Sequence, residues 1–173
     1  MPIPALLPLF SLAVALIMVP LQASHAQDQD ADEIQKHQDW AVRCGPLITG
    51  DGKRVERCVM IQIAGKDNTP ITQIELTLSP KKDQYITQFT TPLGSVLTTG
   101  LRLKIDDGET VRLPYQFCIN TGCRVVLPAK QEFIDSMQKG RTLHIAFDLI
   151  NGKTANAQIS LLGFTSALDA ISN

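Results

Sequence analysis

The chain has 173 residues, of which 44% are hydrophobic and 19% charged, and its formal net charge at pH 7 is -1. A chain of this length suits one domain that buries a sizeable core. Since 16 basic residues balance 17 acidic ones and lie scattered along the chain, the charge argues against a nucleic-acid-binding protein.

The N-terminus is apolar. Residues 1–26 contain no Lys, Arg, Asp or Glu, and the stretch from Ala5 to Val19 is rich in Leu, Ala, Val and Ile. This stretch is shorter than the roughly 20 residues that a membrane-spanning helix needs. We expect residues 1–26 to be a signal peptide, cleaved after Ala26 or, alternatively, after Ala23. A retained membrane anchor or an N-terminal core strand is the alternative interpretation. After cleavage we expect no transmembrane anchor.

An acidic stretch follows this segment. Residues 27–39 contain one basic residue, Lys36, and five acidic ones: Asp28, Asp30, Asp32, Glu33 and Asp39. A short polar segment of one dominant charge is typical of a solvated, disordered arm. The sequence therefore predicts a flexible arm over 27–39 and a single disulfide-stabilised domain over 40–173.

From Trp40 onward, apolar residues alternate with other residues in seven segments. The alternating sets are Trp40, Val42 and Cys44; Val59, Ile61 and Ile63; Ile74, Leu76 and Leu78; Leu101, Leu103 and Ile105; Val111 and Leu113; Leu143, Ile145, Phe147 and Leu149; Ile159 and Leu161. A period of two residues predicts half-buried β-strands, each with one face toward the core.

Turn residues lie between these segments. Asp106-Asp107-Gly108 and Asn151-Gly152 each separate two alternating runs, and the Asn-Gly pair favours a two-residue hairpin because both residues tolerate positive φ. The predicted fold class is therefore mainly β, as an antiparallel β-sandwich or a partly closed barrel.

Two segments carry a helical pattern. Pro128 to Lys139 has apolar residues at helical spacing, a proline at its start and Gly140 after its end. These features predict one helix near 129–139. The tail from Thr165 to Ile171 predicts a short C-terminal helix that covers one end of the sheets.

Four cysteines, Cys44, Cys58, Cys118 and Cys123, follow the apolar N-terminus. An even number of cysteines in an exported chain predicts a disulfide framework. Among three possible connectivities we favour local pairing, Cys44 with Cys58 and Cys118 with Cys123. The first pair closes a loop of 15 residues, and in the chain-entropy account its bridge contributes roughly 3 kcal/mol.

A redox-active pair or a metal site is the alternative interpretation of these cysteines. Catalytic dithiols typically form Cys-x-x-Cys motifs at a helix N-terminus, where the thiol pKa falls. Zinc sites prefer similarly short spacings, and only Cys118 and Cys123 come near to one. We therefore favour structural bridges.

The remaining candidate residues give weak signals. His144 alternates with core positions and should point outward with Ala146 and Asp148, solvent-facing or partner-facing. Lys53, Arg54 and Arg57 form a small basic cluster that could contact an anionic partner, although such clusters are usually a solvated face. We predict no catalytic, cofactor-binding or metal-binding residue and no cofactor.

A set of aromatic, cysteine, glycine and proline landmarks runs along nearly the whole expected domain. They are Trp40 to Cys44, Cys58, Pro92-Leu93-Gly94, Gly100-Leu101, Ile105-Asp106, Pro114-Tyr115, Cys118, Gly122-Cys123, Gly163-Phe164 and Ala167-Leu168. In order and spacing this set resembles the invasion-associated locus B family of exported bacterial proteins.

The resemblance implies a protein of a Gram-negative alphaproteobacterium that is periplasmic, associated with the outer membrane or secreted. It also implies a part in the invasion of host cells, notably erythrocytes, although relatives in non-invasive bacteria indicate a more general envelope role. It supplies no catalytic residues.

We therefore expect a noncatalytic envelope or interaction protein that contributes to host-cell invasion or envelope maintenance. Its partner would be an unknown protein or a surface glycan, and not a nucleic acid. Two alternatives stay open, a periplasmic thiol oxidoreductase or other envelope enzyme, and a carrier of a small ligand.

Overall fold

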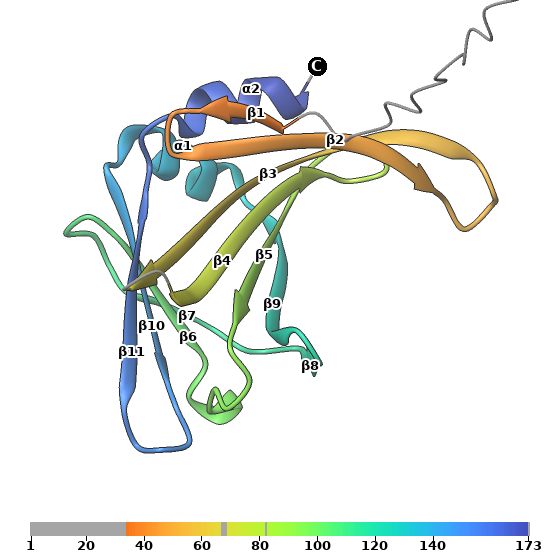
Figure 1. Cartoon of the computed structure of the whole chain (residues 1–173). Helices are drawn as coiled ribbons and strands as arrows, with labels where there is room; N and C mark the ends of the chain where they lie inside the picture. Colours follow the sequence, from red (N-terminus) through yellow and green to blue (C-terminus); the bar gives the residue numbers. More distant parts are fainter. Residues whose placement is uncertain (1–33, 67–68, 82, 173) are drawn as a thin grey trace, which may run out of the picture. The chain divides into compact units, whose positions relative to one another are not determined.

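A computed structural model describes residues 34–66, 69–81 and 83–172. The expected signal peptide and residues 27–33 of the expected arm lie outside the described residues. The described strands form two antiparallel sheets that pack face to face, and neither sheet closes on itself (Figure 1). The predicted antiparallel sandwich is thus confirmed, and the barrel alternative is not.

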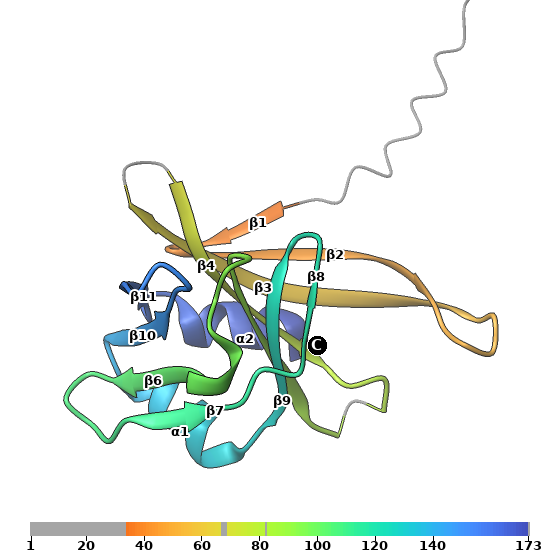
Figure 2. The ribbon, with the colours of Figure 1, turned by 90° about the horizontal axis from the view of Figure 1, so that it is seen from below.

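The larger sheet has seven strands in the order β1-β2-β3-β4-β5-β9-β8. These are β1 (Ile34–His37), β2 (Trp40–Ile48), β3 (Arg54–Lys66), β4 (Thr69–Leu78), β5 (Tyr85–Thr91), β9 (Gly122–Ala129) and β8 (Phe117–Ile119). The ends of β2 and β3 extend beyond the other strands as a two-stranded ribbon (Figures 1 and 2).

The smaller sheet has four strands in the order β11-β10-β6-β7. They are β11 (Thr154–Ser160), β10 (Thr142–Asp148), β6 (Leu101–Ile105) and β7 (Val111–Leu113), and a 3-10 turn, η1 (Leu97–Thr99), precedes β6. Both predicted hairpins are present, β6–β7 around Asp106 to Gly108 and β10–β11 around Asn151-Gly152. The two-residue turn expected from Asn-Gly is wrong, because residues 149–153 join β10 to β11 and Gly152, at a φ of 78°, has a positive φ while Asn151 does not.

Two helices complete the fold, α1 (Gln131–Lys139) and α2 (Phe164–Ser172). The C-terminal helix is confirmed; it contacts β2, β3 and β4 through Phe164, Ala167, Leu168 and Ile171. The helix predicted near 129–139 is confirmed and begins at Gln131. Pro128, just before the predicted range, belongs to β9, opposite Ile86. Gly140 has an extended φ of -78°, and an added Cβ would lie 2.6 Å from the Ile105 side chain.

The core lies between the sheets and under α2. Its largest fully buried side chains are Trp40, Phe89, Phe147, Phe164, Met60, Ile74, Leu76, Leu101, Ile134, Met137, Leu143 and Ile145. The face predicted for β3 is wrong, because Met60 and Ala64 point inward while Ile63 is 55% exposed. Met60 lies directly opposite the buried Val42, and opposed residues share a face.

The arm predicted for 27–39 is wrong for its last residues. Residues 34–37 form β1, which pairs with β2 so that His37 lies opposite Trp40. The turn between them, with Gln38 at a φ of 56°, is held by the Asp39 N–H, which donates to the Leu162 carbonyl at 3.4 Å. The His37 Nδ1 lies 2.8 Å from the Ser166 hydroxyl oxygen.

Both predicted disulfides are present. Cys44 on β2 bonds to Cys58 on β3, and Cys118 on β8 bonds to Cys123 on β9. In each case the two cysteines lie directly opposite each other in the strand register. Each bridge therefore fixes one hairpin, and the pairing follows from the local strand geometry.

Candidate functional site

The outer face of the smaller sheet carries the most coherent group of polar side chains. Residues opposite each other on neighbouring strands share a face, so the register aligns Lys104, His144 and Gln158 in one row across β6, β10 and β11. The next row holds Arg112, Arg102, Ala146 and Asn156. Intervening residues such as Leu103 and Ile145 point into the core.

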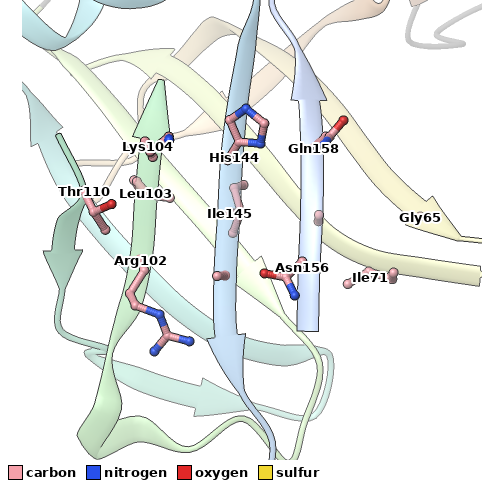
Figure 3. Close-up of a pocket in the computed structure, with 12 residues that line it drawn as sticks. Gly65, Ile71, Arg102, Leu103, Lys104, Thr110, His144, Ile145, Asn156 and Gln158 are labelled. Atoms are coloured by element: carbon pink, nitrogen blue, oxygen red, sulfur yellow. The ribbon is translucent and has the colours of Figure 1, made fainter. Parts of the chain in front are cut away.

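A shallow pocket of about 560 Å³ lies on this face. Lys104, His144, Gln158 and Asn156 line it, together with Thr110 at its β7 end (Figure 3). Adjacent strands are about 4.8 Å apart, so the ends of these side chains are spaced closely enough for one ligand group to meet several of them. Gly65 and Ile71, from β3 and β4, form the opposite rim.

Arg102 also lines the pocket, but its guanidinium group is engaged by Asp148. Nη1 and Nη2 donate to the two carboxylate oxygens at 2.9 and 2.8 Å, and the Thr154 hydroxyl donates to Asp148 at 2.8 Å. In Figure 3 the guanidinium points away from Lys104 and His144. These hydrogen bonds, first from Arg102 and then from Thr154, hold the pKa of Asp148 well below its ordinary value. The same pair raises the pKa of Arg102.

The pair has two consequences for the chemistry of the face. Asp148 serves Arg102 rather than His144, so the imidazole has no carboxylate from that residue to orient it as a catalytic triad would. The Arg102 guanidinium is therefore held in place by Asp148, while Lys104, His144, Asn156 and Gln158 present their side chains to the pocket. Among the described residues that line the pocket, none is acidic.

Lys104 forms an ion pair with Asp107, whose carboxylate lies 3.7 Å from the ammonium nitrogen. Asp107 lies in the β6–β7 turn and is fully exposed, and ion pairs of this kind contribute little in water. An ammonium group, an imidazole and two amides in a pocket whose described lining holds no carboxylate are suited to bind an anionic or hydroxyl-rich group.

Sequence reasoning placed His144 on an outer face but missed Lys104, Asn156 and Gln158. The sequence pattern that could have identified them is the alternation of polar residues with core residues in three separate segments. Local alternation shows that each of them points outward, but only the pairing of β6, β10 and β11 shows that they lie side by side.

The basic cluster predicted from the sequence lies on the β2–β3 ribbon. Lys53 pairs with Asp51 at 2.9 Å, and the Arg57 Nε donates to the Thr77 hydroxyl at 3.0 Å. Arg54 and Arg57 are three positions apart on one strand, so their side chains start on opposite faces. The three residues therefore do not form one continuous patch.

All four cysteines lie on strands, away from any helix N-terminus that would lower a thiol pKa. Within the described part of the chain, no group of three or more His, Cys, Asp or Glu side chains is arranged to hold a metal ion. No helix in that part has the length and apolarity to span a bilayer.

Comparisons with known proteins agree with this fold. The chain is 26% identical over 142 residues to an invasion protein B homolog of Brucella abortus (strain 2308), covering 79% of this chain and 78% of that protein. It is 24% identical over 141 residues to invasion protein B of Bartonella bacilliformis, covering 78% and 72%. Both relatives carry names of invasion proteins rather than of enzymes.

A crystal structure of invasion associated protein B from Bartonella henselae has a similar fold. Its TM-score is 0.67 at 19% identity, and the match covers 80% of this chain and 95% of that one. The family model of the invasion associated locus B protein matches residues 40–172, which include both disulfides and the whole small sheet. The chain therefore belongs to the invasion-associated locus B family.

Proposed function

We propose that this chain is an exported, non-enzymatic interaction protein that binds an acidic glycan with the outer face of its smaller sheet. The observation that carries the proposal is the carboxylate-free row of Lys104, His144 and Gln158, with Asn156 beside it. The two disulfides support export, because such bonds persist in oxidising compartments.

A glycan fits this face better than a folded protein does. The pocket is shallow, and its polar groups are an ammonium, an imidazole, amides and the Thr110 hydroxyl, beside the Arg102 guanidinium. These groups can pair with carboxylate or sulfate groups and with sugar hydroxyls. Protein interfaces usually have a central apolar or aromatic anchor, and no aromatic side chain is among the described residues of this pocket.

At the level of the cell, we propose that this binding contributes to host-cell invasion or to envelope maintenance. The names of the Brucella and Bartonella relatives support the first role. In either case the protein would act from the periplasm, from the outer membrane or after secretion.

The proposal is tested by binding the purified oxidised protein to heparin, as a probe acidic polysaccharide, and to a neutral dextran. We expect saturable, salt-sensitive binding to heparin alone, and at least a fivefold loss of affinity in the double variant Lys104→Gln/His144→Gln. Both residues are partly exposed on strands, so the fold should survive.

The matched control is the ribbon variant Lys53→Gln/Arg54→Gln. It removes at least as much positive charge as the Lys104→Gln/His144→Gln variant does, but away from the pocket, and it should lose less affinity for heparin. A larger loss in the ribbon variant would move the binding site to the ribbon. Preference for an acidic protein over heparin would replace the glycan with a protein partner. Equal binding to dextran would refute recognition of acidic groups.

A further inference from the structure

A second opening lies between the two sheets, on the side where β7 faces β9. This cleft has a volume of about 580 Å³, which is within the usual range of small-molecule sites. Its walls are β6 and β7 on one side and β9 and α1 on the other. The apolar side chains that line it include Phe89, Leu103, Ile105, Leu113, Leu127 and Phe133.

Val111 shows that this side of the sandwich is uncovered. It lies opposite Leu103 in the β6–β7 register and therefore on the inner face of the small sheet. Leu103 is only 5% exposed, yet Val111 is 53% exposed. The inner face of the sheet thus continues into open solvent. Covering apolar surface of this kind with a ligand lowers the free energy of the complex.

The strand edges beside the cleft are poorly suited to an added peptide strand. On β9, the N–H of Val126 already donates to the Gln116 side chain at 2.6 Å. Pro128, two residues further on the same edge, has no N–H to offer. On the other side β7 has only three residues and is followed at once by Pro114. A peptide that bound by strand addition would therefore lack the usual ladder of main-chain hydrogen bonds.

An alkyl chain needs no such hydrogen bonds, and each methylene group that it buries contributes about 0.8 kcal/mol. The polar residues of the cleft indicate what its headgroup would be. They include one cation, Lys130, and two carboxylates, Glu109 and Glu132; Lys104 also borders the cleft, but its side chain starts on the outer face of the small sheet. Charges of both signs complement a headgroup that carries both charges better than they complement a simple anion.

We propose that this cleft binds a single-chain zwitterionic amphiphile of the lysophospholipid class. The alkyl chain lies between β6–β7 and β9–α1, in contact with Leu103, Leu127 and Phe133. The headgroup lies among the side chains of Lys130, Glu109 and Glu132. This site is separate from the outer face of the small sheet, and Lys104 is the polar residue that lines both openings.

The experiment is a titration of the purified oxidised protein with 1-palmitoyl lysophosphatidylcholine below its micellar concentration, followed by calorimetry. We expect saturable binding of one molecule per chain. In Val111→Glu a carboxylate stands in the apolar mouth, so the affinity should fall at least tenfold. Val111 is half exposed, so the variant should fold.

Val55→Glu is the matched control, because Val55 is an exposed valine on a strand of the ribbon, 40% exposed and outside the cleft. It should bind lysophosphatidylcholine as the parent protein does. Palmitate is the second ligand, and we expect it to bind at least threefold more weakly. Heparin binding should be equal in both valine variants, which separates this site from the proposed glycan site.

The absence of saturable binding, or an equal loss in both valine variants, would overturn the proposal. Palmitate binding as tight as that of lysophosphatidylcholine would overturn the assignment of a zwitterionic headgroup. If a short apolar peptide displaced the lipid, the cleft would bind an added peptide strand instead, and the proposal would be overturned.

Discussion

The two long sides of the sandwich differ in how they are closed. On the β11 side, β11 contacts β3 and β4, and α2 lies beside β2. The Trp40 ring meets Phe164 edge to face at 5.3 Å, and its Nε1–H donates to the Ser160 carbonyl at 3.0 Å. On the β7 side, a short strand and the cleft leave Val111 half exposed. The closed side is thus built for stability, and the open side is available for a ligand.

The closed side depends on a close approach that only glycine allows. Gly163 has a φ of 87°, and a Cβ on it would lie 2.0 Å from the His37 carbonyl oxygen. This approach brings the start of α2 against the β1–β2 turn, where Asp39 bonds to Leu162. The Gln62 side chain donates to the Asp39 carbonyl at 2.7 Å and holds the turn from the other side.

The largest effect is expected from Gly163→Ala. The new methyl group collides with main-chain atoms, and the residue must keep a positive φ, so the free energy of unfolding should fall by about 3 kcal/mol or more. Urea denaturation measures this loss. The control is Gly152→Ala, which has a φ of 78° but nothing within 4 Å of its Cβ, and should lose only about 1 kcal/mol. Equal losses would contradict a role for close packing.

Removal of each disulfide compares the two sides directly. Cys44 and Cys58 are 14 residues apart and belong to β2 and β3, while Cys118 and Cys123 are 5 apart, beside the open side. From loop length, Cys44→Ala/Cys58→Ala should cost about 3 kcal/mol and Cys118→Ala/Cys123→Ala about 2 kcal/mol. Thermal and urea unfolding measure both. Equal stability of the fully reduced and oxidised protein would rule out the structural role of both bridges.

A stabilising change is expected at Thr87, on β5. This side chain is fully buried between Leu76 and Leu127, and its hydroxyl has no hydrogen-bond partner among the described residues. Thr87→Val removes an unsatisfied group and should raise the free energy of unfolding by about 1 kcal/mol.

Thr91→Val is the matched control for this change, because the Thr91 hydroxyl lies on the same face of β5 and contacts the hydroxyls of Ser95 at 2.8 Å and Tyr115 at 3.0 Å. Its loss should destabilise the protein by about 1 kcal/mol. Urea denaturation measures the change in the free energy of unfolding for both variants. A change of the same sign in both would show that the hydrogen bonds of these hydroxyls do not determine the effect of the substitution.

The smallest effect is expected at Asp148, on the outer face. Its pKa is lowered in the folded protein by hydrogen bonds from Arg102 and Thr154. The ionised carboxylate therefore contributes stability above the ordinary aspartate pKa of about 3.9, and this contribution is lost as the pH falls toward the lowered value. Asp148→Asn should be less stable than the parent at pH 7, and the gap should narrow below about pH 4. If the difference between the urea midpoints of the parent protein and Asp148→Asn stayed constant from pH 7 to pH 3, the Arg102–Asp148 ion pair would be excluded as its cause.

Much of the fold could be predicted because its signals are local. The β6–β7 and β10–β11 hairpins follow from turn residues between alternating runs, and α2 follows from its own apolar spacing. The cysteine pairing was predictable for the same reason, since each pair lies within one hairpin.

The face of β3 was not predictable from its own residues. Both of its faces carry apolar side chains, Val59, Ile61 and Ile63 on one and Met60 and Ala64 on the other. A period of two residues separates the faces but does not say which one is buried. The choice is made by β2, which places Met60 opposite Val42. Pro128 was likewise read as the start signal of a helix and not as a strand residue, because strand pairing with Ile86, 42 positions earlier in the chain, leaves no local signal.

By itself the sequence determined the strands with clear apolar alternation, the turn positions between them and the two cysteine pairs, because each depends on residues that are neighbours in the chain. It did not predict β1 or β5. Tertiary structure decided which faces are buried, that Lys104, His144 and Gln158 form one row, and that a cleft opens beside β7. The physical reason is that these features depend on the register between strands and on which segments cover each sheet. The register and the covering are fixed by hydrogen bonding and burial between distant parts of the chain, and only when the whole chain has folded.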